Sequence, residues 1–140
     1  MKPIGISTAK RLGLASVLFA AGCASTPVSP LQKDAALSAD KGKVFDTALL
    51  TLQEWGEDIL TVDKGGGILA TRPRESGALR YRLTIFVKES EGGGSLVEVN
   101  AHGEKHTPEQ DDWWSVDEND PDLRSIIEGV LAGVVQKVGG

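Results

Sequence analysis

A strict alternation of side chains in the middle of the chain limits the fold more than any other feature. From residue 79 to 88, apolar side chains alternate with mostly polar ones, and residues 97–104 repeat the pattern after a glycine-rich turn at 91–95. A period of two with one apolar face is typical of antiparallel strands that are covered on one side only. The apolar set is Leu79, Tyr81, Leu83, Ile85, Val87, Val97, Val99 and Ala101. On the polar face, Arg80, Arg82 and Lys88 are expected opposite Glu98 and Glu104.

Two amphipathic helices are expected to cover this hairpin. Asp40 can cap the first, its apolar residues recur at helical spacing from Val44 to Trp55, and Gly56 ends it. The second helix starts with Asn119 or Asp120 as cap and Pro121 at its first position. Small residues on one of its faces indicate close packing against a neighbour, namely Gly129, Ala132 and Gly133.

A second, shorter hairpin is predicted between the first helix and the long hairpin. Two β-branched runs, 58–64 and 68–72, flank the three glycines at 65–67, and a loop follows at 73–77. The expected fold is therefore a single α+β domain of order α-β-β-β-β-α. Its antiparallel four-stranded sheet would be covered on one face by two helices.

The N-terminal residues have the composition of an export signal. Lys10 and Arg11 precede an apolar run from Leu12 to Gly22, which is too short to span a bilayer permanently. The residues before Cys23, the only cysteine, are Ala20, Ala21 and Gly22. They resemble the lipobox of bacterial lipoproteins, although Ala20 stands where that family usually has Leu. The resemblance implies a signal peptide at 1–22 and diacylglycerol with further acylation, such as palmitate, on Cys23. The alternatives are conventional cleavage near Gly22, with an incidental thiol, or an uncleaved apolar helix.

The residues after the cysteine are expected to form a flexible tether. Residues 24–39 are rich in proline and small polar side chains without a steady apolar period, so the domains are assigned as 1–22, 23–39 and 40–140. After removal of 1–22 the chain keeps 12 basic and 20 acidic residues, a net charge near -8. This balance argues against nucleic acid as a partner. In enteric lipoproteins, Asp directly after the lipidated cysteine resembles an inner-membrane retention signal. This chain has Ala24 at that position, which favours the periplasmic face of the outer membrane, with the inner membrane as the alternative.

The domain also carries a pattern of hydrophobic and glycine positions over about residues 43–105. The pattern runs through Val44, Phe45 and Trp55, then Asp63, the three glycines and Thr71. It resembles the helix-grip domains of the C-type lipoprotein of the outer-membrane β-barrel assembly machinery and of small lipoproteins without assigned function. The resemblance implies an envelope interaction or assembly-accessory role, although this chain has room for one such domain only.

One group of side chains could bind a metal. His102, Glu104 and His106 share a strand face at i, i+2 and i+4 and could hold Zn²⁺ with an open position, as in a metal-dependent hydrolase. The simpler interpretation is a solvated polar face on which Glu104 pairs with Arg80. The acidic loop 108–122 does not match a Ca²⁺-binding loop, because position six counted from Asp117 is Asp122 and not Gly. No cofactor is predicted.

Trp113 and Trp114 are the most informative residues of the acidic loop. Two adjacent side chains in extended geometry point in opposite directions, so one of them is expected to be exposed as a recognition or carbohydrate-stacking residue. The alternative is that both cover an edge of the core. The sequence favours a non-enzymatic, lipid-anchored envelope protein with a protein partner. The alternatives are a binder of a small apolar ligand between helices and sheet, or the metal-dependent hydrolase at His102, Glu104 and His106.

Overall fold

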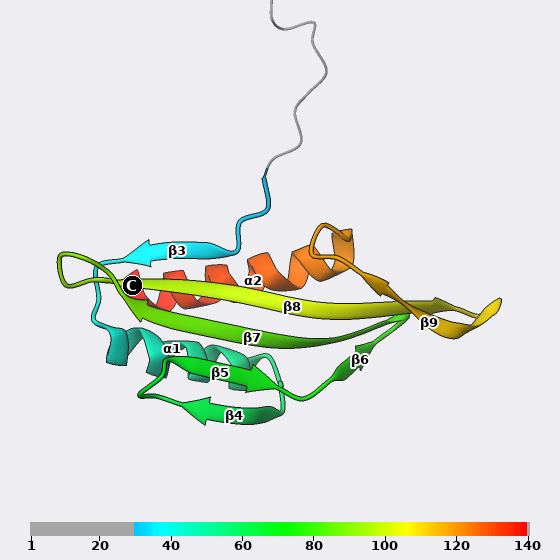
Figure 1. The fold of residues 1–140 in the computed structure, drawn as a ribbon, viewed down its shortest axis with the longest axis horizontal. Helices are drawn as coiled ribbons and strands as arrows, with labels where there is room; N and C mark the ends of the chain where they lie inside the picture. Colours follow the sequence, from blue (N-terminus) through cyan, green and yellow to red (C-terminus); the bar gives the residue numbers. More distant parts are fainter. Residues whose placement is uncertain (1–29, 140) are drawn as a thin grey trace, which may run out of the picture. The chain divides into compact units, whose positions relative to one another are not determined.

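The computed structural model of the chain describes residues 30–139, and the described residues from Leu31 onward form one compact unit. In this unit two helices lie on one face of a mixed-length antiparallel sheet (Figure 1). The α+β class and the two helices agree with the sequence analysis, but the described residues form seven strands and not the predicted four. The signal peptide 1–22 and Cys23 lie outside the described residues.

The long hairpin is the centre of the sheet. Strand β7 (Leu79–Glu89) and strand β8 (Ser95–Thr107) pair without interruption from Leu79 opposite Lys105 to Glu89 opposite Ser95. The predicted pair of Arg80 and Glu104 is confirmed, with 2.7 Å between Arg80 Nε and Glu104 Oε1. The other predicted pairs are wrong, because Arg82 lies opposite His102 and Lys88 opposite Leu96.

The shorter hairpin and both helices form close to where the sequence places them. Strands β4 (Ile59–Asp63) and β5 (Ile68–Thr71) extend the sheet beside β7. Helix α1 (Lys41–Glu54) begins after Asp40, whose carboxylate accepts a hydrogen bond from Lys43 N. Helix α2 (Pro121–Gly139) begins after Asp120, whose Oδ1 accepts from Asp122 N and Leu123 N. Both caps satisfy backbone N–H groups that a helix leaves without partners.

Three short strands were missed because their sequences are polar or weakly patterned. Strand β3 (Asp34–Leu37) falls within the predicted tether 23–39 and pairs with β8. Strand β6 (Arg74–Ser76) falls in the predicted loop 73–77 and pairs with β7, and strand β9 (Gln110–Val116) falls in the acidic loop and pairs with β8. Each is an edge strand whose pairing with a long central strand outweighs its own weak β-propensity.

The core lies between the sheet and the two helices. Phe45, Leu52, Leu83, Ile85 and Ile127 are all nearly or completely inaccessible to solvent. The two helices pack against each other at small residues, since a Cβ at Gly129 would lie 2.8 Å from the ring of Trp55, and one at Gly133 would lie 3.1 Å from Thr51. The close packing predicted for this face is therefore found at both glycines, whereas Ala132 is exposed. The opposite face of the sheet, here called the outer face, carries Arg80, Arg82, His102 and Glu104.

Candidate functional site

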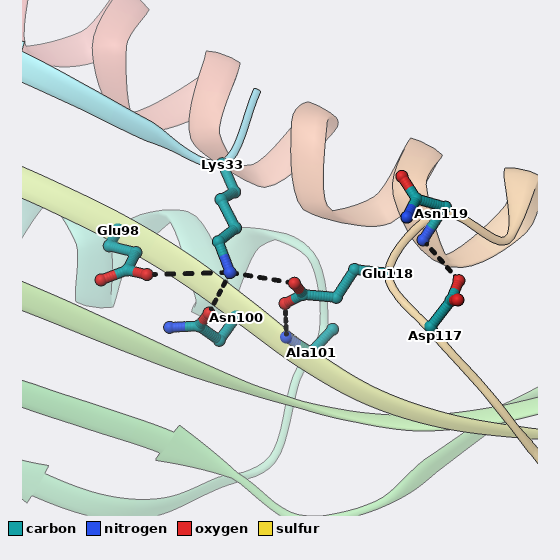
Figure 2. Close-up of polar contacts among 7 residues, drawn as sticks. All are labelled: Lys33, Glu98, Asn100, Ala101, Asp117, Glu118 and Asn119. Atoms are coloured by element: carbon teal, nitrogen blue, oxygen red, sulfur yellow. Dashed lines mark hydrogen bonds and ion pairs between the residues drawn. The ribbon is translucent and has the colours of Figure 1, made fainter. Parts of the chain in front are cut away.

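A cluster of charged and polar groups holds the N-terminal segment against the sheet (Figure 2). Lys33 Nζ lies 2.9 Å from Asn100 Oδ1, 2.9 Å from Glu118 Oε1 and 3.8 Å from Glu98 Oε2. The hydrogen bond to Glu118 raises the pKa of Lys33, although partial burial of the ammonium acts in the opposite direction. The ammonium is therefore charged in this position at neutral pH.

The same cluster completes the edge of β8 between two short strands. Strand β3 covers the first part of this edge and β9 the last part. Between them, Val99 N donates to Lys33 O at 2.7 Å and Ala101 N donates to Glu118 Oε2 at 3.3 Å. A backbone carbonyl and a carboxylate thus supply acceptors that a neighbouring strand would otherwise provide. This arrangement indicates a structural role for the Lys33 cluster, which fixes where the chain enters the domain.

The outer face carries an ordered group of aromatic and cationic side chains. The guanidinium carbon of Arg80 lies 4.2 Å from the centroid of the Trp113 ring, and the His106 ring lies 4.2 Å from it at a tilt of 55°. Glu104 holds the other side of Arg80 through the 2.7 Å hydrogen bond. Cation–π and aromatic contacts of this kind fix rotamers that would otherwise be free. Arg80, Trp113 and His106 therefore hold one another in place on the outer face.

A cavity of about 440 Å³ adjoins this group on the outer face. Arg80 and Glu104 belong both to the ordered group and to the cavity wall. The full lining is Pro73, Glu75, Arg80, Tyr81, Arg82, His102 and Glu104. We call these residues together with His106 and Trp113 the outer-face site. Both helices lie on the other face of the sheet (Figure 1). In the described part of the chain, no second layer of helices covers the outer face.

The two adjacent tryptophans point to opposite sides of the sheet, as extended geometry requires. Trp113 lies half-buried against Arg80 and His106, whereas Trp114 is 40% exposed. Trp114 lies opposite Lys105, whose ammonium is 2.8 Å from both Asp120 and Asp122 at the start of α2. The β9 edge therefore presents one large exposed aromatic side chain close to a helix start. Whether either residue contacts a partner stays a prediction.

The three candidate metal ligands are used in other ways. Glu104 accepts from Arg80, the His106 ring packs on Trp113, and His102 is exposed in the cavity wall. Among the described residues no group of three or more His, Cys, Asp or Glu side chains is placed to hold a metal ion. The simpler interpretation of this strand face, a pairing of Glu104 with Arg80, is the one the geometry supports.

The acidic loop contributes caps and ion pairs. Asp117 Oδ1 accepts a hydrogen bond from Asn119 N at 2.9 Å (Figure 2). Asp120 caps α2. Burial raises the pKa of Asp120, but the hydrogen bonds from Lys105 and from the backbone N–H of Leu123 outweigh this effect and lower it. Asp117 and Asp120 therefore both have hydrogen-bond partners in the fold. The positive end of the helix dipole of α2 also favours negative charge at this position.

A buried carboxylate was not identified from the sequence. Glu57 is 6% exposed, and its Oε2 accepts from Tyr81 Oη at 2.7 Å and from Arg74 Nη1 at 3.0 Å. Arg74 Nη1 also donates to the carbonyl of Trp55 at 2.7 Å, which is at the end of α1. Burial, and then the hydrogen bond to Glu57, raise the pKa of Tyr81 to about 12. In the sequence, Glu57 follows Gly56 and resembles an ordinary polar turn residue.

The space that an apolar ligand would need between helices and sheet is occupied. Phe45, Leu83 and Ile85, at 1% exposure or less, fill it together with residues from both helices. A separate hollow of about 650 Å³ lies on the surface between the N-terminal segment and α2. It is lined by Gln32, Glu128, Leu131, Ala132, Val135 and Gln136. A ligand in the interior would have to displace the core itself.

The comparisons with known proteins identify no family. No family model matches the chain, and no curated protein matches it. Among the described residues, no helix has the length and apolar character needed to span a membrane.

Proposed function

We propose that this chain is a lipid-anchored protein of the bacterial cell envelope that docks another envelope protein and catalyses no reaction. The anchor is a lipid on Cys23, after removal of residues 1–22, on the periplasmic face of the outer membrane or, alternatively, on the inner membrane. The sequence before Cys23 supports lipidation of this residue. Multiple acyl chains on Cys23 would hold the protein stably on a bilayer.

The observation that carries the docking role is the ordered outer-face site. Arg80, Trp113 and His106 contact one another on a sheet face that neither helix of the described residues covers, beside a cavity of about 440 Å³. Tryptophan and arginine are the residue types that dominate binding energy at protein interfaces. Side chains that are already ordered lose little entropy on binding. Trp114, exposed on the other side of the same strand, extends this surface around the β9 edge.

The test is capture of the partner from a detergent extract by the intact lipidated protein. Trp113→Ala and Trp114→Ala are compared separately with Leu50→Ala, a 47% exposed apolar residue on α1 that serves as matched control. Loss of an interface tryptophan typically costs about 2 kcal/mol or more, roughly a 30-fold loss of affinity. We expect capture to fall by this order for at least one tryptophan variant and to be unchanged for Leu50→Ala. Equal capture by all three variants would remove the tryptophans from the interface.

A further inference from the structure

Strand β4 is an edge strand whose exposed side is unusually apolar. It is the last strand of the order β3-β8-β7-β5-β4 and pairs with β5 on one side only. Leu60 is 54% exposed and Val62 is 56% exposed, the two most exposed large hydrophobic side chains of the described residues. Proteins usually protect such an edge with charges or proline, because its unpaired backbone groups can bind another strand.

The sequence of β4 is complementary to itself when two copies run antiparallel. If Thr61 lies opposite Thr61 of a second copy, the same register places Leu60 opposite Val62 on both sides of the centre. It also places Ile59 opposite Asp63 and, one residue beyond each end of the strand, Asp58 opposite Lys64. Along the strand, the two apolar pairs therefore lie between the two charged pairs. Apolar and opposite-charge cross-strand pairs both stabilise antiparallel strands.

The present partners of the two charged residues do not prevent this pairing. Asp58 lies 3.3 Å from Arg72 and Lys64 lies 3.0 Å from Asp46, and all four side chains are more than half exposed. Exposed ion pairs of this kind contribute little to stability, so their rearrangement is inexpensive. The residues that follow the β-bulge, Thr61 to Asp63, pair with β5 in a regular register, so the bulge lies on one side of the proposed centre.

We propose that two copies of this chain associate through their β4 edges, in the register centred on Thr61, to form one continuous sheet. The two-fold axis passes between the Thr61 residues of the two copies, as the closed symmetry of a homodimer requires. The β4 edge and the outer-face site lie at different parts of the sheet, so the association does not depend on the proposed docking function.

Site-specific disulfide formation tests the register. The full chain carrying Cys23→Ser is purified in detergent with a single new cysteine, introduced either by Thr61→Cys or by the control Asp63→Cys on the same strand. In the proposed register the two thiols introduced at position 61 lie directly opposite each other. The two thiols introduced at position 63 are offset by four positions, about 13 Å, which exceeds the reach of a disulfide. Under mild oxidation we expect Thr61→Cys to form a disulfide-linked dimer. Its yield should be at least tenfold higher than the yield of the dimer for Asp63→Cys. Equal crosslinking, or none, overturns the proposal.

A charge exchange tests the ends of the pairing by a second measurement. Asp58→Lys and Lys64→Asp each place like charges opposite each other in the dimer, whereas the double variant restores opposite charges. Sedimentation over a range of concentrations should show weaker association for each single variant and recovery for the double variant. Circular dichroism checks that each variant is folded. Association that does not respond to the single variants, or that the double variant fails to restore, overturns the proposed register.

Discussion

At the residue scale, the most unusual group is the buried Glu57 carboxylate. Its Oε2 accepts from Tyr81 and Arg74, while its Oε1 is buried with no hydrogen-bond partner among the described residues. A buried carboxylate is tolerated when charged donors compensate for its desolvation. The group joins the end of α1, strand β6 and strand β7 at one point.

Removal of the Tyr81 hydroxyl should destabilise the domain. Tyr81→Phe keeps the ring in the core but takes one of two donors from Glu57 Oε2. Hydrogen bonds to charged groups contribute roughly 1.5–3 kcal/mol. We expect the free energy of unfolding, measured by urea denaturation at pH 7, to fall by about 2 kcal/mol. An unchanged midpoint and slope would show that Arg74 alone satisfies Glu57.

The same hydroxyl makes stability depend on pH in the alkaline range. The pKa of Tyr81 is raised to about 12 in the folded chain, from its ordinary value near 10. The stabilisation is therefore complete below about pH 10 and is lost as the pH rises through about 12. The native chain should lose stability over this interval more steeply than Tyr81→Phe. Because Tyr81 is the only tyrosine, its ultraviolet absorbance reports the titration directly, and a midpoint near 10 in the folded chain would contradict the assignment.

At the scale of elements, local and periodic sequence patterns predicted the helices and hairpins. Strands and contacts that depend on residues far apart in the sequence were not predicted. The long hairpin, the β4–β5 hairpin and both helices follow from alternation, glycine turns and capping residues within a few positions. Strands β3, β6 and β9 are held by pairing to β7 and β8, and their own sequences carry little β-signal. The Arg80–Glu104 pair followed from hairpin register, and the opposite directions of Trp113 and Trp114 followed from extended geometry. Lys33 meets Asn100 and Glu118, 67 and 85 residues away, which no local pattern reveals.

Strand β3 should loosen when Lys33 loses its charge. Lys33→Met removes the contacts to Asn100 and Glu118 but keeps most of the side-chain volume. Since these groups are partly exposed, we expect a loss of about 1 kcal/mol in unfolding free energy. Amide hydrogen exchange at Val99, whose N–H donates to Lys33 O, should also become faster. The exposed Lys88→Met on β7 is the control, and equal effects of both variants would deny Lys33 a specific role.

At the scale of the whole molecule, the described domain and the proposed lipid site are separable. The compact unit begins at Leu31, after Cys23. Cys23→Ser should therefore release a folded domain from the membrane into the soluble fraction of fractionated cells. The chain's net negative charge gives it no attraction to anionic headgroups. Full retention of the variant on membranes would mean that the lipobox resemblance is misleading.

Strand β3 also limits how far a lipid-anchored domain could search for a partner. A fully extended linker of residues 24–39 would allow the domain to lie up to about 55 Å from its anchor. With residues 24–30 as the linker, this maximum distance is about 25 Å. The volume accessible to a tethered domain grows with the cube of the linker length. Pairing of β3 with β8 therefore reduces this volume roughly tenfold. If Cys23 is lipidated as proposed, the start of β3 would therefore stay within about 25 Å of the anchor, which favours a partner in the same membrane.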